Sequence, residues 1–152
     1  MDKISSKQLK KLQVWKKTSR IGVTNGCFDL LHKGHLSSLK SAKRYCDKLV
    51  VLLNSDKSTK KNKGKLRPIQ NEKIRKKKLL KNRNVDMVIV FNKKTPYKMI
   101  KQIKPDFLFK GSDYKNKNII GSRFVLKNGG KVKILKNIRG ISTTNIINKK
   151  WL

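Results

Sequence analysis

The sequence predicts an α/β protein built on a parallel sheet of about five strands, with helices on both faces. Two observations lead to this class. Runs of consecutive apolar residues, clearest at 48–54 and 85–91, are typical of strands that are buried on both faces of a sheet. These runs alternate with longer segments of helical periodicity. Strands joined in this way need crossover connections, and we therefore expect them to run parallel.

The predicted elements follow one another in a regular order. The expected strands cover 20–24, 48–54, 85–91, 106–110 and 131–135, and the expected helices cover 5–17, 33–46, 70–82, 95–103, 119–127 and 142–149. Ser5, Thr95 and Ser142 are expected to cap the helices that they begin, with Pro96 in the first turn after Thr95. The polar segment 55–67 is expected to be a loop. This order is typical of a doubly wound, Rossmann-like sheet, in which ligands bind beyond the carboxyl ends of the strands.

The chain is strongly basic, with 41 Lys and Arg against 8 Asp and Glu and a net charge of +33. Such a surplus attracts polyanions, including nucleic acid, anionic membranes and phosphorylated substrates. However, Lys greatly outnumbers Arg, whose planar guanidinium is better suited to bidentate binding of phosphate and bases. The lysines are also spread from end to end of the chain. We therefore favour a compositional bias over a dedicated surface, and we do not expect nucleic acid to be the primary partner.

The apolar segments and the cysteines indicate the compartment. No stretch approaches the ~20 apolar residues that span a bilayer, and the N-terminal region has no apolar run like that of a signal peptide. We expect no membrane partner. Cys27 and Cys46 are too few for a disulfide framework and lack metal-site spacing. We expect them to be reduced and the protein to be cytoplasmic.

The only two histidines of the chain, His32 and His35, lie together where the first strand turns into a helix. A helix N-terminus presents free N–H groups and the positive end of the dipole, and so attracts phosphate. Gly34 between them lets the backbone approach a nucleotide closely. Imidazoles at this point can donate hydrogen bonds to phosphate oxygens as charge shifts during transfer. We therefore predict that this turn binds phosphate and stabilises its charge during transfer.

A second candidate phosphate site lies at 139–144, where a glycine is followed by three hydroxyl residues at a predicted helix start. Backbone N–H groups and hydroxyls arranged in this way can cradle a phosphate. The same residues also suit an ordinary helix cap. These residues alone leave both interpretations open.

Together, the motifs HxGH at 32–35 and ISTT at 141–144 resemble the cytidylyltransferase-like nucleotidyltransferase superfamily, over residues 21–147. KGKLRPI at 63–69 and KPDFLFKGSDY at 104–114 are more specific. They are similar to the heptose 1-phosphate adenylyltransferases, which occur alone or as the second half of two-domain ADP-heptose synthases. The length of 152 residues fits one domain. We therefore expect a single domain over 1–152, in which a helix at 1–19 precedes a catalytic core at 20–147.

The resemblance also implies the reaction. A heptose 1-phosphate would take AMP from ATP, giving ADP-heptose and pyrophosphate with no covalent enzyme intermediate. We therefore do not expect Cys27 to be a nucleophile. Mg²⁺ would arrive with ATP and keep most of its waters, so that no protein ligand to a metal is expected. A separate sugar kinase, a homodimeric state and a bacterial source that uses the product for lipopolysaccharide are further expectations.

Roles follow position by position from the same resemblance. The expected catalytic residues are His32, His35 and Lys63. The expected nucleotide-binding residues are Thr24, Gly26, Cys27, Phe28, Gly34, His35, Lys110, Gly111, Asp113, Arg139, Ser142, Thr143 and Thr144. The expected substrate-binding residues are Asp29, Asn54, Asp56, Lys63, Arg67 and Tyr114.

Two departures from the heptose pattern keep alternatives open. Ser112 stands where these adenylyltransferases often have a second glycine, and the sequence at 139–141 is closer to that of glycerol-3-phosphate cytidylyltransferases. A glycerol-3-phosphate cytidylyltransferase-like or FAD-synthetase-like transferase is the alternative enzyme. The non-enzyme alternative is a basic nucleic-acid-binding protein, which would bind with a steep dependence on salt.

Overall fold

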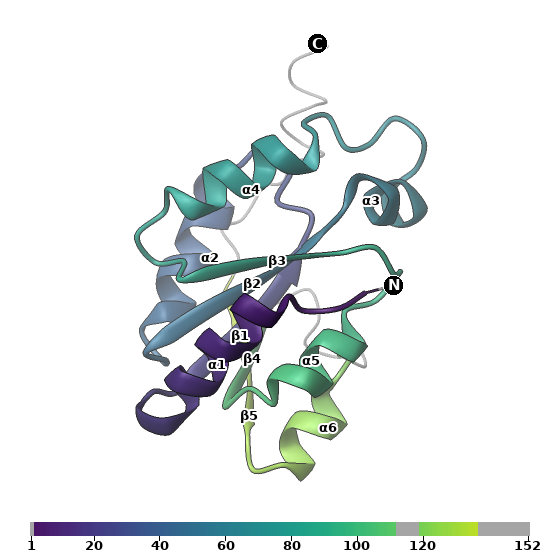
Figure 1. Cartoon of the computed structure of the whole chain (residues 1–152). Coiled ribbons are helices and arrows are strands. Elements are labelled where there is room, and N and C mark those ends of the chain that lie inside the picture. Colours follow the sequence, from purple (N-terminus) through teal and green to yellow (C-terminus); the bar gives the residue numbers. More distant parts are fainter. Residues whose placement is uncertain (1, 112–118, 137–152) are drawn as a thin grey trace.

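In a computed structural model of the chain, which describes residues 2–111 and 119–136, five parallel strands form a sheet in the order β3-β2-β1-β4-β5 (Figure 1). The strands are β1 (Ile21–Gly26), β2 (Lys48–Asn54), β3 (Met87–Phe91), β4 (Phe107–Gly111) and β5 (Lys131–Leu135). The chain proceeds from the central β1 outward to β3, and then crosses back to β4 on the other side. This reversal confirms the predicted doubly wound, Rossmann-like class.

Helices cover both faces of the sheet, as predicted. They are α1 (Ser6–Thr18), α2 (Lys33–Lys43), α3 (Asp56–Lys63), α4 (Glu72–Leu80), α5 (Tyr97–Ile103) and α6 (Ser122–Lys127). Strand β2 is buried on both sides, because Val50 and Leu52 face α1, α5 and α6 while Val51 and Leu53 face α2 and α4. Each of these side chains is 0% exposed, and burial of each contributes about 1.5–3 kcal/mol to folding.

The N-terminal helix forms where the sequence predicts it. The Ser5 hydroxyl caps α1 by accepting a hydrogen bond from the Gln8 N–H at 3.1 Å. Ahead of the helix, the carboxylate of Asp2 accepts hydrogen bonds from the N–H groups of Asn92 and Lys93, at 2.7 and 2.8 Å. The start of the chain thus holds the loop that follows β3.

The segment 55–67 contains a helix, so the prediction of a loop there is wrong. Ser55 caps α3 by accepting from the N–H of Ser58. Ser58 and Thr59 are buried, and their hydroxyls donate to the backbone carbonyls of Lys93 and Asn54. Because this helix buries polar side chains, it has no apolar periodicity from which it might be predicted.

Helix limits also differ from the prediction. Thr95 does not cap α5, which begins at Tyr97 with Pro96 as its cap residue and no side-chain capping bond. The Thr95 side chain instead lies at the wall of a cavity. Helices α2 and α4 are each a few residues shorter than expected, and the helix predicted at 142–149 lies outside the described residues. Within the described ranges, no helix is long and apolar enough to cross a membrane.

Candidate active site

The sheet opens at the point where the strand order reverses. Strand β1 pairs with β2 up to Gly26, but pairs with β4 only through Gly22 and Val23. Beyond Val23 the two central strands diverge, and a cavity of about 420 Å³ lies between their carboxyl ends. This position is where ligands bind in doubly wound sheets. A volume of this size fits the range of small-molecule sites.

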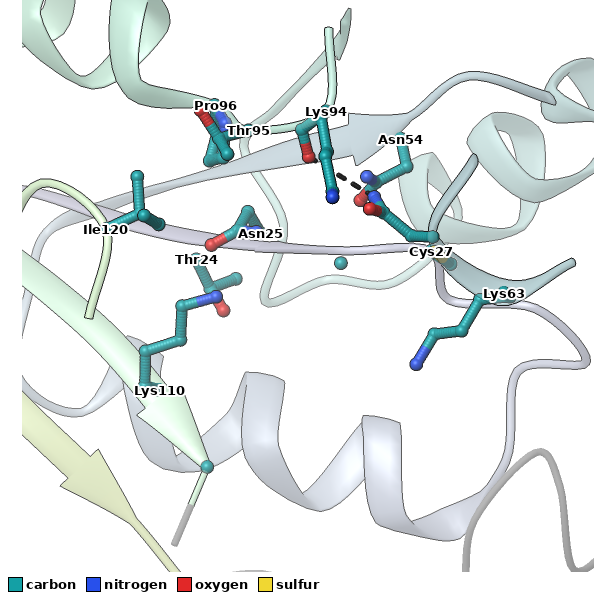
Figure 2. A pocket seen from close by; sticks show the side chains of 13 residues that line it. Thr24, Asn25, Cys27, Asn54, Lys63, Lys94, Thr95, Pro96, Lys110 and Ile120 are labelled. Carbon is teal, nitrogen blue, oxygen red and sulfur yellow. Dashed lines mark hydrogen bonds between the residues drawn. The ribbon is translucent and has the colours of Figure 1, made fainter. Parts of the chain in front are cut away.

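Three lysines from different parts of the chain lie around this opening (Figure 2). Lys63 comes from the end of α3, Lys94 from the loop after β3, and Lys110 from β4. No acidic residue is among the described residues that line the cavity. Lys63 and Lys94 form no ion pair with an acidic side chain in the described ranges. The cavity therefore suits a ligand that carries several negative charges.

The two histidines stack on each other at the start of α2, with ring centroids 3.7 Å apart. His32 Nδ1 accepts hydrogen bonds from the N–H groups of Gly34 and His35, at 3.1 and 3.3 Å. His35 Nδ1 accepts from the N–H of His32 at 3.3 Å. Because each Nδ1 is an acceptor, a neutral ring carries its hydrogen on Nε2. The amide of Gly34, a residue predicted to let the backbone approach a nucleotide, is bonded to His32 in this structure.

Both histidines are held neutral. Burial lowers the pKa of His32 below its ordinary value. Burial, together with the neighbouring His32, lowers the pKa of His35 to about 3, although Asp29 opposes the shift. His32 Nε2 is buried and has no hydrogen-bond partner among the described residues. A buried N–H donor without an acceptor is costly, and a phosphate oxygen is a suitable acceptor.

The turn between β1 and α2 is strained and anchored by Asp29. Phe28 and Leu30 have φ values of 48° and 49°, which cost non-glycine residues about 1–3 kcal/mol each. Between them, the fully buried carboxylate of Asp29 accepts from Arg67 Nε at 3.1 Å. It also accepts from two backbone N–H groups of the segment that follows Arg67, at 2.7 and 3.0 Å. Asp29 and Arg67, predicted to bind substrate, bind each other here.

Phe28 and Asp56 likewise have structural partners. The Phe28 ring is buried and lies 5.2 Å from the His35 ring, which it supports. Asp56 accepts from Arg75 Nη2 at 2.8 Å, and its own N–H donates to Glu72. In this structure the two residues, predicted to bind nucleotide and substrate, hold the walls of the site.

Arg75 joins the parts of the site, although it was not among the predicted residues. Its side chain is fully buried. Nη1 donates to the carbonyls of Cys27 and Asn54, at 2.8 and 2.7 Å, and Nε donates to the carbonyl of Gln70 at 2.9 Å. With Asp56 as a fourth partner, Arg75 ties the ends of β1 and β2 to α3 and α4. A buried arginine is stable only where hydrogen-bond acceptors such as these offset the loss of hydration.

The structure brings together many of the predicted site residues. Those that line the cavity are Thr24, Gly26, Cys27, Asn54, Lys63, Lys110 and Gly111. Those in the adjoining turn, α2 and the 56–67 region are Phe28, Asp29, His32, Gly34, His35, Asp56 and Arg67. Those outside the described residues are Asp113, Tyr114, Arg139, Ser142, Thr143 and Thr144.

Six lining residues were not predicted to belong to the site, namely Asn25, Asn62, Lys94, Thr95, Pro96 and Ile120. For three of them a signal existed, because Lys94, Thr95 and Pro96 follow directly on the buried run that becomes β3. Residues at the carboxyl end of a parallel strand face the ligand edge of the sheet. Their place after β3 corresponds to that of Asn54 at the end of β2, which was predicted from the family resemblance alone.

The fold, the switch-point cavity and the paired histidines define a nucleotide-binding α/β domain, and comparison with known proteins gives its family. The family model described as Cytidylyltransferase-like matches residues 23–149. The chain therefore belongs to the cytidylyltransferase-like family and is a nucleotidyltransferase.

Among its relatives are bifunctional proteins named HldE. The chain is 43% identical over 140 residues to HldE of Rhodopseudomonas palustris (strain BisB5), a match that covers 91% of this chain and 29% of that protein. It is 48% identical over 128 residues to HldE of Caulobacter vibrioides, covering 84% and 26%. The chain thus spans less than a third of the length of these relatives.

Solved structures also match. The lipopolysaccharide core biosynthesis protein from Thermoplasma volcanium is 32% identical with a TM-score of 0.63, and the match covers 79% of this chain and 97% of that one. Pantothenate synthetase from Thermus thermophilus has a TM-score of 0.64 at 16% identity, covering 96% and 67%. The latter shares the fold.

Replacing Arg75 by Met should lower the free energy of unfolding by about 3–5 kcal/mol, because it removes the buried guanidinium that donates to Asp56 and to the carbonyls of Cys27, Asn54 and Gln70. Arg83→Met is the matched control, since Arg83 is exposed and its loss should cost less than about 0.5 kcal/mol. Urea unfolding of both variants measures the difference. If Arg75→Met does not fold, Arg75→Lys keeps the charge with fewer donors and should give an intermediate loss. Equal stability of Arg75→Met and Arg83→Met would contradict the role assigned to Arg75.

The stability of the protein should depend on His35 at acidic pH. The unfolded chain protonates this residue near its ordinary pKa of 6.5, whereas the folded chain keeps it neutral down to about 3. Its contribution is therefore fully present above about pH 6.5 and decreases as the pH falls towards 3, by up to about 1.4 kcal/mol per pH unit. His35→Gln removes the titration but keeps an acceptor for the His32 N–H. In urea unfolding between about pH 4.5 and 7, the wild type should lose more stability than the variant. Parallel curves would show that His35 is not held neutral by the fold.

Proposed function

We propose that this chain transfers AMP from MgATP to the phosphate of a heptose 1-phosphate, which gives ADP-heptose and pyrophosphate. The observation that carries the proposal is the pairing of two features at one edge of the sheet. Three lysines surround a cavity at the switch point, and two neutral histidines on the adjoining helix carry Nε2 hydrogens. Together they offer charge for phosphates and directed donors for the oxygens that gain charge during transfer.

The reaction needs one displacement. An oxygen of the sugar phosphate attacks the α-phosphorus of ATP, a new P–O bond forms, and the bond to the β-phosphate bridge breaks. Pyrophosphate leaves with that electron pair. Catalysis of this kind rests on positioning and on stabilising the charge of the transition state. In this proposal His32 and His35 contact the α-phosphate, and Lys63 with Lys94 contacts the acceptor phosphate or the departing pyrophosphate.

Mg²⁺ belongs to the nucleotide substrate in this proposal. Within the described residues, no group of three or more His, Cys, Asp or Glu side chains is placed to hold a metal ion. Mg²⁺ prefers to keep several waters and to bind through substrate phosphates, and the lysine-lined cavity suits a metal–triphosphate complex. Arrival of Mg²⁺ with ATP remains a prediction.

The choice of ATP and a heptose phosphate rests on sequence and relatives. KGKLRPI at 63–69 and the start of KPDFLFKGSDY at 104–114 place Lys63, Lys110 and Gly111 on the cavity wall, so the specific motifs lie at the site. The HldE relatives are bifunctional, and the chain spans a part of them. A sugar kinase acting before this chain would supply the acceptor. The structural match to a lipopolysaccharide core biosynthesis protein supports the same use of the product.

The assembly and the compartment also remain proposals. A homodimer is expected from the resemblance alone. Both cysteines are free, and burial raises the pKa of Cys46 to about 11, which keeps that thiol unreactive. Free thiols are consistent with a reducing cytoplasm.

Pyrophosphate release should require ATP together with heptose 1-phosphate. The assay compares ATP and CTP, each against heptose 1-phosphate and glycerol 3-phosphate, with Mg²⁺. His35→Ala should lower kcat by roughly 10²-fold or more, because a directed donor to the α-phosphate is lost. More efficient use of CTP than of ATP would contradict the nucleotide assignment. If the folded wild type releases no pyrophosphate in any of the four mixtures, the proposed reaction is refuted.

Lys63 should matter for turnover where its neighbour Lys61 does not. Both are exposed residues of α3, but of the two only Lys63 lines the described cavity. Lys63→Ala should lower kcat/KM on the order of 10-fold or more, since it removes a charge that faces the phosphates. Lys61→Ala removes the same charge from the same helix and controls for the general field of the protein. Equal effects of the two changes would mean that Lys63 acts only through net charge.

A further inference from the structure

A second cavity adjoins the first. It has a volume of about 460 Å³ and lies between the beginning of α5 and the segment that leads into α6. Thr95 and Ile120 line both cavities. The two spaces are therefore neighbours that share these side chains as a common wall, and a ligand in one is within reach of the other.

The lining of the second cavity is amphipathic. Ile119, Ile120 and Phe124 make it largely apolar, and Tyr97 adds a half-exposed aromatic ring. Three hydroxyl side chains and one guanidinium complete it, on Thr95, Tyr97, Ser122 and Arg123. No acidic residue is among the described residues that line it. Sites for small molecules commonly combine an apolar lining with a few polar groups that fix orientation.

We propose that this second cavity holds the sugar ring of the acceptor while the acceptor's phosphate occupies the first cavity, beside Lys94. The inference rests on the proposed function and deepens it, because it names the residues that select the acceptor. A sugar ring has apolar C–H faces and a rim of hydroxyls. In this proposal the apolar lining packs against the C–H faces of the sugar, and the hydroxyl and guanidinium groups form hydrogen bonds with its hydroxyls.

The connectivity of the two substrates favours the sugar over the adenine. In a sugar 1-phosphate, a single oxygen joins the ring to the phosphate, so the ring must lie directly beside the phosphate site. In ATP, the ribose separates the base from the α-phosphate. The two cavities share Thr95 and Ile120 as a wall, with Lys94 beside that wall in the first cavity. A ring in the second cavity would thus lie next to a phosphate in the first, as the acceptor requires.

Tyr97 is the residue whose change tests this subsite. Its ring is 43% exposed, and Lys101 Nζ lies 5.4 Å from the ring centroid, so that a change to Leu leaves the core intact. Tyr97→Leu should raise the KM for heptose 1-phosphate on the order of 10-fold, the usual loss for one pocket contact, while the KM for ATP stays within about 2-fold. Tyr45→Leu is the matched control, because Tyr45 is equally exposed at 42% and lies just beyond α2, before β2.

Each outcome decides a different point. A raised KM for ATP with an unchanged KM for heptose 1-phosphate would overturn the inference and place the base in the second cavity. Unchanged values for both substrates would also overturn it, and would leave the proposed function intact. If Tyr97→Leu fails to fold, Ser122→Trp fills the same cavity and should raise the KM for the acceptor in the same way. Absence of turnover in the wild type would refute the proposed function first, and this inference with it.

Discussion

The buried guanidinium of Arg75 is the constraint on which the carboxyl edge of the sheet depends. Removing such a charge from water costs several kcal/mol, and hydrogen bonds to acceptors inside the protein must offset it. Arg75 makes four such bonds, to Cys27, Asn54, Gln70 and Asp56. These partners come from three segments of the chain, around Cys27, around 54–56 and at Gln70, so the cost is offset only when all three are in place. Two of them, Cys27 and Asn54, line the cavity. The stability of the core and the shape of the site are therefore set by the same side chain.

A second buried charge extends this dependence to the histidines. Asp29 lies in the strained turn that Arg75 holds at Cys27. Its carboxylate accepts hydrogen bonds from Arg67 and from two N–H groups of the segment that follows, and so holds that segment against the turn. The turn delivers His32 as the cap of α2, and His32 orients His35 by stacking and by their reciprocal hydrogen bonds. Phe28 and Leu30 keep their strained backbone conformations because the contacts of Cys27 before them and of Asp29 and His32 around them fix the path of the chain. The fold itself thus fixes two neutral donors, and fixed donors of this kind are the preorganisation that stabilisation of a developing charge requires.

Much of the fold follows from the sequence, because apolar runs and helical periods record burial directly. The doubly wound class and the five strands were predicted in this way. Lys63, Lys110 and Gly111, which were assigned binding or catalytic roles from motifs, line the cavity, and those roles stay predictions. Helix α3 was missed because its buried face is made of Ser58 and Thr59, which carry no apolar signal. Arg75 was missed because one basic residue among 41 is inconspicuous. Its importance comes from acceptors on several segments, and only the three-dimensional arrangement brings them together.

The acidic residues explain how so basic a chain keeps a defined fold. Eight are present, and Asp113 lies outside the described residues, which leaves seven. Each of the seven accepts a hydrogen bond from a backbone N–H or a buried arginine; they are Asp2, Asp29, Asp47, Asp56, Glu72, Asp86 and Asp106. The acids of the described chain thus stand where the backbone or Arg75 needs an acceptor, and none lines the cavity. A bias towards lysine therefore costs the structure little, because the anchoring carboxylates remain. The described lining of the switch-point cavity carries no acidic side chain, and this absence strengthens the attraction of anionic ligands to it.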